Sequence, residues 1–566
     1  MEAATEMRVF TMIYGHCLTL QVVKDVQIYR TSSELAPTFL LAAAIVWSHL
    51  SRSESALLGL AASALLVLCT HGSQSNHVTL EAIIALGVLL TAPAPRWRSA
   101  SSKRSHPGEA ETEREQRRLL WSGRLTVSMR AVLGVLYAMT GFAKLNDAWH
   151  DPHVSCCVQM FLGSVANFVD VRLLPPVLLR SLPYGATAFE LGFPLALAGA
   201  HVCETTSRPG AARAVLRALT IMGAIFHVVI ALPPPPMSVY PFSMIMAPIY
   251  FQSLLPDDVR RAARAAAAWL RNRHVLVVAV IAVAVAGALR VTNGTTRGSV
   301  RFEYPPYFSW ELGVLWTLCS FGGLATVAAL APAAPSAPRG ARATYSKLRL
   351  TLALVPAACV FAVACSTYVG VRTYPSFAMF SNLVVEGGMS NHWLVQRPSD
   401  WALLAPPEYG PHRAIEILET DLPALRDLQV NLAPLLPPEV LEAFRVANAS
   451  AELYITPPAW PYAPTEPFRP FAVPVIEVRR RLAVAALRTS DFYVRYRDVP
   501  GVIAAGGDSA GAGAVRAEDV VREYRRQEGE LMPGSDASLE KPLPPLRALL
   551  HKYRTFDRQG RAPCRH

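Results

Sequence analysis

The stretch YAMTGFAKLNDAWHDP, residues 137–152, contains a single lysine, which lies at the end of an apolar run. Lys144 has Tyr137, Phe142 and Trp149 as its aromatic neighbours in sequence. Because burial among aromatic side chains disfavours a charged ammonium, this setting predicts a neutral amine that can act as a base near neutral pH. The alternative is a lysine that extends to the lipid headgroups and only anchors its helix.

His227 is the second candidate, within the apolar run 214–232. An ionisable side chain inside a membrane helix is a functional hypothesis in itself, since its burial in lipid is costly. Such a histidine can equally serve as a hydrogen-bonding residue between helices. The sequence leaves both interpretations open.

A polar stretch, TYPSFAMFSNLVVEGGMSNHWLV, occupies residues 373–395. Its polar side chains are Ser381, Asn382, Glu386, Ser390, Asn391 and His392. The Gly387-Gly388 pair predicts a hairpin that joins two short strands. We favour a structural collar that seats a C-terminal domain on a helical bundle, over direct substrate binding by Glu386, Asn391 and His392.

Composition identifies the class of protein that must position these residues. The chain has 566 residues, of which 52% are hydrophobic and only 17% charged. Soluble proteins carry about 25% charged residues, so this composition predicts an integral membrane protein. The net charge of +12 lies largely in short basic stretches between apolar runs, without interleaved aromatic residues, so we expect no nucleic-acid partner and membrane lipid as the surrounding medium.

Apolar runs of membrane-spanning length recur along the first two thirds of the chain. They are residues 36–50, 54–71, 78–93, 125–143, 180–200, 214–232, 237–255, 274–291, 309–331 and 351–371. The predicted fold is mainly α, a polytopic transmembrane helical bundle of about nine or ten spans, since the first run is short enough to lie in the membrane interface. The bundle is expected over residues 1–375, and a β-containing extramembrane domain over 376–566.

The basic segments 94–124, 256–273 and 333–350 predict cytoplasmic loops. Residues 144–179 and the C-terminal domain then lie on the opposite, non-cytoplasmic side. The glycosylation sequons at Asn293 and Asn448 fall on that side as well. We expect a multi-pass protein of the endoplasmic reticulum membrane in a eukaryote, or of the inner membrane in a bacterium.

Within the C-terminal part, AELYITPP, FAVPVIEVRR and DFYVRYRDV predict strands. Residues 506–530 resemble a glycine-rich loop that leads into a charged helix, or a disordered insert. The Gly507–Gly511 stretch GDSAG matches a hydrolase nucleophile elbow, but no oxyanion loop precedes it, so we disfavour a hydrolase.

The nine cysteines contain no C-x-x-C pair, and no metal site is predicted. Cys156 or Cys157 can pair with Cys564 in a disulfide, because all three are expected on the non-cytoplasmic side.

Residues Gly141–Trp149, GFAKLNDAW, and residues 226–251, which begin Phe-His and include a Phe-Ser pair, resemble two segments of the vitamin K-dependent gamma-glutamyl carboxylases. Both segments also occur in the broader HTTM membrane-domain family. The resemblance implies that Lys144 deprotonates reduced vitamin K or a related hydroquinone, and that His227 assists the oxygenated quinone, with Phe142 and Trp149 lining the pocket. It further implies epoxide formation, with or without carboxylation of glutamates on a protein substrate.

Two function classes therefore remain. One is a quinone-oxidising membrane enzyme, and the other is a non-enzymatic scaffold, carrier or assembly factor of the same fold. The enzyme requires that Lys144 be unpaired in an apolar cavity. An ion pair with Asp147 or Glu190 favours the scaffold.

Overall fold

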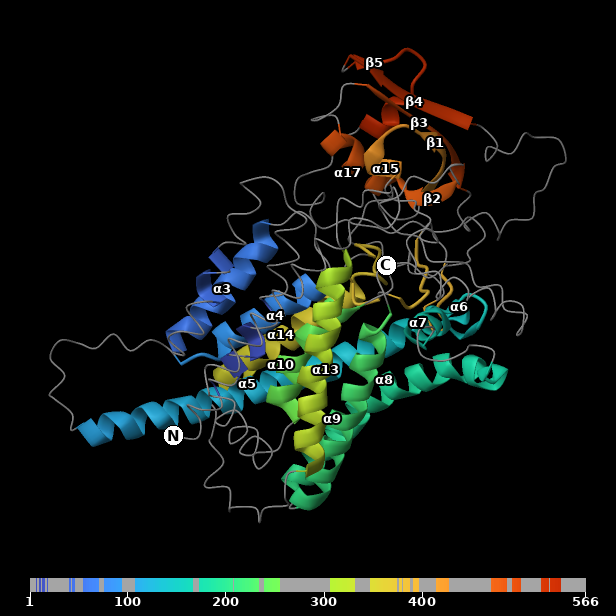
Figure 1. The fold of residues 1–566 in the computed structure, drawn as a ribbon. Helices are drawn as coiled ribbons and strands as arrows, with labels where there is room; N and C mark the ends of the chain where they lie inside the picture. Colours follow the sequence, from blue (N-terminus) through green and yellow to red (C-terminus); the bar gives the residue numbers. More distant parts are fainter. Residues whose placement is uncertain are drawn as a thin grey trace, which may run out of the picture. The chain divides into compact units, whose positions relative to one another are not determined.

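Figure 1 shows the computed structural model of the chain. It describes residues 7, 10, 11, 13–15, 18, 40, 41, 43–45, 54–70, 76–93, 107–165, 173–206, 208–233, 239–254, 306–330, 347–373, 376–378, 380–386, 390–395, 414–426, 470–485, 491–499, 521–528 and 530–540. The chain forms two compact units. The first comprises residues 1–137 and 192–360, and the second comprises residues 138–191 and 361–566.

The first unit is helical where it is described. Its complete helices are α3 (Glu54–Thr70), α4 (Asn76–Thr91), α9 (Pro209–Ala231), α10 (Tyr240–Leu254) and α13 (Pro306–Leu330). Helices α5 (Pro107–Ala143), α8 (Pro176–Thr205) and α14 (Lys347–Cys365) have residues in both units. These segments are rich in alanine and leucine, and a helix satisfies its backbone hydrogen bonds internally, as an apolar environment requires.

Close helix contacts in the first unit depend on glycine. A side chain added at Gly223 of α9 would collide with the ring of Tyr250 on α10. Gly313 of α13 makes the same kind of approach to Tyr240. Small residues at these positions therefore let α9, α10 and α13 pack closely together.

Four helices among the described residues are long and apolar enough to cross a membrane: Glu111–Ala143, Pro176–Thr205, Pro209–Ala231 and Lys347–Cys365. Large apolar side chains remain exposed on them, including Leu195, Ile225 and Phe361. These features indicate a membrane protein. The predicted nine or ten spans are not confirmed, because Glu54–Val67, Asn76–Thr91 and Gly313–Ala329 are apolar but shorter, and 274–291 lies outside the described residues.

Helix α5 begins at Pro107, well before the apolar run that starts at residue 125. The basic segment 94–124 was predicted as a loop, and from residue 107 onward this is wrong. Charged pairs one turn apart, such as Glu113 with Arg117 at 2.5 Å, support the helix there.

The second unit contains two short helices, α6 (Asp147–His150) and α7 (Cys156–Val165), and an antiparallel sheet. The sheet consists of β1 (Ala414–Thr420), β2 (Phe471–Pro474), β3 (Phe492–Val499), β4 (Val521–Gln527) and β5 (Glu530–Leu531), in the order β2-β1-β3-β4-β5. Helices α15 (Pro423–Arg426) and α17 (Val475–Ala485) and the 3-10 helix η7 (Ala537–Glu540) accompany it.

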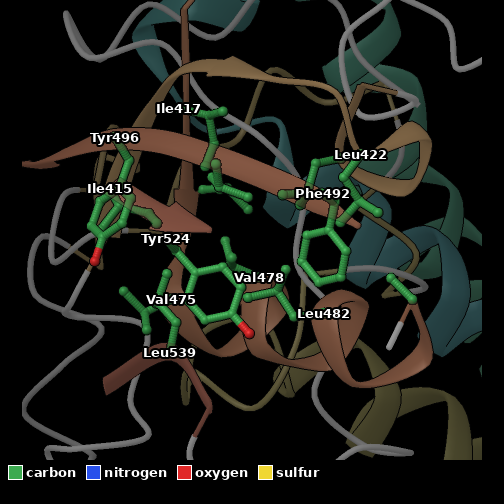
Figure 2. Close-up of a cluster of buried hydrophobic side chains, with 14 of the residues drawn as sticks. Ile415, Ile417, Leu422, Val475, Val478, Leu482, Phe492, Tyr496, Tyr524 and Leu539 are labelled. Carbon is green, nitrogen blue, oxygen red and sulfur yellow. The ribbon is translucent and has the colours of Figure 1, made fainter. Parts of the chain in front are cut away.

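One face of the sheet carries the core of this part (Figure 2). Phe492, Val494 and Tyr496 alternate along β3 and are buried together with Val478 and Leu482 of α17. Alternate side chains of a strand point to opposite faces, so β3 presents Tyr493, Arg495 and Arg497 on its other side. There Arg497 pairs with Glu416 of β1 at 2.5 Å.

The strand predictions have mixed outcomes. DFYVRYRDV forms β3, as predicted, whereas FAVPVIEVRR forms β2 only as far as Pro474 and then continues as α17. The predicted charged helix or disordered insert at 506–530 is wrong for residues 521–527, which form β4. AELYITPP and GDSAG lie outside the described residues.

Candidate functional site

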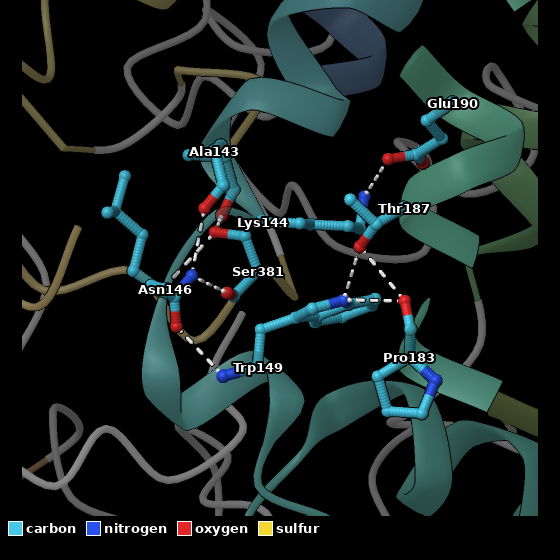
Figure 3. A network of polar contacts seen from close by, with 10 residues as sticks. Ala143, Lys144, Asn146, Trp149, Pro183, Thr187, Glu190 and Ser381 are labelled. Carbon is cyan, nitrogen blue, oxygen red and sulfur yellow. Dashed lines mark hydrogen bonds and ion pairs between the residues drawn. The ribbon is translucent and has the colours of Figure 1, made fainter. Parts of the chain in front are cut away.

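Lys144 follows the last residue of α5 and is buried. Its Nζ lies 2.5 Å from Oε2 of Glu190 on α8, and 5.0 Å from the centre of the Trp149 ring (Figure 3). The side chains of Lys144 and Glu190 are only 10% and 5% exposed. The ammonium thus has a carboxylate on one side and an aromatic ring on another, both of which stabilise positive charge.

Trp149 is fixed by its own hydrogen bonds. Its indole Nε1 donates to the carbonyl of Pro183 at 3.1 Å and to the hydroxyl of Thr187 at 3.0 Å, both on α8 (Figure 3). Glu190 lies one turn beyond Thr187 on the same helix. Helix α8 therefore supplies both the carboxylate that binds Lys144 and the groups that orient the ring beside it.

Asn146 organises the turn between Lys144 and Trp149. Its Oδ1 accepts from the backbone N–H of Trp149 at 2.8 Å and caps α6, while Nδ2 donates to the carbonyls of Ala143 and Ser381. We did not select Asn146 from the sequence. The signal was present, because asparagine before Asp147 is a preferred helix N-cap.

The expectation that Lys144 is an unpaired amine is wrong. The predicted alternatives for a pairing acid were Asp147 and Glu190, and it is Glu190 that pairs with Lys144. Asp147 instead accepts a hydrogen bond from the indole of Trp393 at 2.7 Å. Tyr137, expected beside Lys144, belongs to the first unit, where its hydroxyl hydrogen-bonds with His227.

Residues 383–385 connect the end of α5 to the sheet. Leu383 and Val385 pack with Ala143 and Ala378, whereas Val384 packs with Ala414, Ala472 and Val499 of the sheet. This alternation is that of an extended chain. We use the name collar for residues 373–395, and their predicted role of seating the C-terminal domain on the helical bundle stays a prediction. The predicted two-stranded hairpin is absent from its described residues, where only an isolated bridge between Asn146 and His392 forms.

His392 and Asn391 have structural partners in the collar. His392 Nε2 donates to the carbonyl of Phe142 at 2.8 Å, and Nδ1 accepts from the backbone N–H groups of Leu394 and Val395, each at 3.1 Å. Asn391 donates to the carbonyl of Asn382 and accepts from the N–H of Val384. Both side chains predicted to bind substrate therefore have their polar atoms engaged within the chain.

The remaining two predicted binding residues are also packed in the second unit. The ring of Phe142 lies 4.5 Å from the His392 ring and 5.4 Å from that of Tyr368. Glu386 is buried, and one of its carboxylate oxygens accepts from the N–H of Val385 at 2.9 Å. A role for Phe142, Trp149, Glu386, Asn391 and His392 in binding a substrate stays a prediction.

His227 lies in the first unit, inside an aromatic cluster. Its Nε2 is 3.0 Å from the hydroxyl of Tyr137, which lies 2.5 Å from the hydroxyl of Tyr250, and its Nδ1 is 3.2 Å from Ser243. Phe321 stacks on the imidazole at 5.0 Å. These hydrogen bonds join three helices, as the structural interpretation of His227 predicts, and a catalytic role of His227 stays a prediction.

The cysteine predictions are resolved in part. Cys157 is a free thiol, so Cys156 is the one of the two alternatives that remains for a disulfide. Cys564, Asn293 and Asn448 lie outside the described residues, so the pairing with Cys564 and both glycosylation sites stay predictions. No group of three or more potential metal ligands occurs within the described part of the chain.

Comparisons of this chain with protein-family models, curated proteins and solved structures found no match.

Proposed function

We propose that this chain is a non-enzymatic integral membrane scaffold that holds its C-terminal sheet at the end of membrane helices. The observation that carries the proposal is the buried ion pair between Lys144 and Glu190. A base must direct a free electron pair at its substrate, whereas Nζ of Lys144 lies against the carboxylate of Glu190 and beside the ring of Trp149. The residues around Lys144 do not fit the role of base toward a hydroquinone.

The collar supports the same conclusion. The collar has polar side chains of types that occur in catalytic sites, but its residues join the sheet to the end of α5. The side chains of His392 and Asn391 form hydrogen bonds with backbone groups. A buried, satisfied polar network of this kind fixes one arrangement of the chain. On this proposal, Lys144 and Glu190 position α5 against α8, and the collar transmits that position to the sheet.

Quinone oxidation is the second candidate, and the chain Ser243–His227–Tyr137–Tyr250 favours it. Oxidation of a hydroquinone releases protons, and linked hydroxyl and imidazole groups can relay them. The resemblance of residues 141–149 and 226–251 to the carboxylase family points in the same direction. In this second candidate function, the group that accepts the proton of the hydroquinone lies near His227 and is not Lys144.

One assay separates the two candidates. The purified full chain in lipid nanodiscs is supplied with reduced vitamin K, oxygen and bicarbonate, and the quinone products are separated by chromatography. A glutamate-rich peptide with labelled bicarbonate tests carboxylation in parallel. The scaffold predicts neither epoxide nor label above a protein-free control.

Variants define which outcome overturns the proposal. Epoxide that persists in the double variant Lys144→Met with Glu190→Met but is lost in His227→Phe would establish the second candidate. Epoxide that is lost in Lys144→Ala, in protein whose thermal unfolding matches wild type, would restore Lys144 as the base. Either result rejects the scaffold.

A further inference from the structure

We propose that a patch in the second unit, formed by Val177, Tyr184, Trp393 and Leu394 around the buried ring of His150, contacts the headgroup region of the bilayer. This inference rests on the membrane location in the proposed function. It adds which residues of the second unit contact the lipid headgroups. The four side chains of the patch are two aromatic and two aliphatic groups, and each of them is exposed. Trp393 is 43% exposed, Tyr184 57%, Leu394 70% and Val177 71%.

The patch is a defined structure and not a scatter of side chains. The indole of Trp393 stacks on the imidazole of His150 at 4.6 Å, and His150 lies 4.6 Å from the ring of Tyr184 on α8. Val177 is two turns before Tyr184 on the same helix and therefore shares its face. Leu394 follows Trp393 directly.

Trp393 is held in one orientation by its polar atoms. Its Nε1 donates to Asp147 at 2.7 Å, and its backbone N–H donates to the carbonyl of Leu145 at 2.9 Å. The polar edge of the indole is thus satisfied within the protein. The part of the ring that remains exposed is apolar, as in tryptophans that line a membrane interface.

The length of α8 favours lipid as the occupant. The helix has 30 residues, and at a rise of about 1.5 Å per residue it measures about 45 Å. The hydrocarbon core of a bilayer is about 30 Å thick, so the ends of a helix this long extend into the headgroups. Val177 and Tyr184 lie in the first three turns of α8, and Arg180 between them is exposed, where a cation can meet lipid phosphates.

The test measures whether Trp393 touches lipid. The full chain is reconstituted in vesicles whose phospholipids are brominated either near the headgroup or near the methyl end of the acyl chains. Bromine quenches indole fluorescence on contact, and the emission of wild type minus Trp393→Phe isolates Trp393. We expect stronger quenching of this difference emission by bromine near the headgroup.

Controls keep the outcomes distinct. The difference emission of Trp149→Phe reports a buried indole of the same unit and should be insensitive to both lipids. Leu394→Trp added to Trp393→Phe should restore quenching, and Trp393→Tyr replaces Trp393→Phe if the latter does not fold. If other tryptophans are quenched but Trp393 is not, the patch contacts a protein or nothing and this inference fails alone. If no tryptophan is quenched, the membrane location fails with it.

Discussion

Nε2 of His392 donates a hydrogen bond to the carbonyl oxygen of Phe142, 250 residues earlier in the chain. This carbonyl belongs to the last turn of α5, and it also accepts from the backbone N–H of Leu145 at 3.0 Å. Nδ1 of the same ring accepts two backbone N–H groups and so carries no proton. His392 is therefore neutral, and it closes the end of α5 with a side chain from the collar.

The neutral state of His392 predicts a dependence of stability on pH. Burial lowers the pKa of His392 below its ordinary value of 6.5, and the hydrogen bond to Phe142 opposes this only in part. Above pH 6.5 the ring is neutral in both states. As the pH falls below 6.5, the unfolded chain binds the proton first, so the free energy of unfolding should decrease until the pH reaches the lowered pKa. Thermal unfolding in detergent between pH 7.5 and 5 measures this.

Replacement of His392 by glutamine provides the control. The glutamine variant should be less stable than wild type at neutral pH, because the acceptor for the Leu394 and Val395 N–H groups is lost or weakened. Its unfolding temperature should decrease less than that of wild type over the same acidic range. An equal decrease in both proteins would show that other groups control the pH dependence.

The ion pair of Lys144 and Glu190 predicts non-additive substitutions. Lys144→Met or Glu190→Met alone leaves a buried charge without its partner, which costs about 3–5 kcal/mol. The double variant removes both charges, so we expect it to recover most of this loss. Thermal unfolding of the four proteins closes the cycle. Additive losses would mean that the pair contributes nothing specific.

The close approach of Gly223 to the ring of Tyr250 predicts that a larger residue at this position destabilises the first unit. Gly223→Ala would place a methyl group against the ring of Tyr250 and should cost about 1–3 kcal/mol through overpacking. The hydrogen bond between Tyr250 and Tyr137 should be disturbed as well. Gly192→Ala on α8 is the matched control, since nothing lies within 4 Å of the added methyl group, and it should be neutral or slightly stabilising. Equal unfolding temperatures for the two variants would refute the packing argument.

The packing of Val384 against the sheet predicts that the collar attaches the sheet to the end of α5. Val384→Asp would bury a carboxylate among Ala414, Ala472 and Val499, at a cost of several kcal/mol unless the sheet detaches. We expect limited proteolysis to release the C-terminal part much faster than in wild type. Val521→Asp, on the exposed surface of β4, should leave the cleavage rate unchanged. Wild-type protection in Val384→Asp would rule out the collar as the attachment.

Patterns that depend on local periodicity were predictable from the sequence. DFYVRYRDV alternates and forms β3, the apolar run at 180–200 lies within α8, and the run at 214–232 forms α9 as far as Ala231. Local signals failed where another segment decides the outcome. VREYRRQ is charged enough to suggest a helix, yet it forms β4, because β3 offers a partner edge and the core accepts Tyr524. Propensity is a weak prior against such tertiary contacts.

The candidate site was predictable in its members but not in its pairing. Lys144, Trp149 and His392 were selected by residue type, and each one is buried in the structure. The state of Lys144 depends on Glu190, 46 residues away, and no pattern within residues 137–152 indicates that this acid rather than Asp147 reaches the lysine. Pairing across helices is a property of the tertiary structure, which a single sequence does not contain.

Leu383 and Val385 pack in one hydrophobic cluster, and Val384 between them packs in another. Deleting or inserting one residue here would exchange their directions and present each side chain to the wrong partner. The length of this segment is thus fixed even though its composition is ordinary. In homologous chains, insertions and deletions should occur before or after this segment but not within it. The constant length of the segment should therefore identify the collar even where its residues differ.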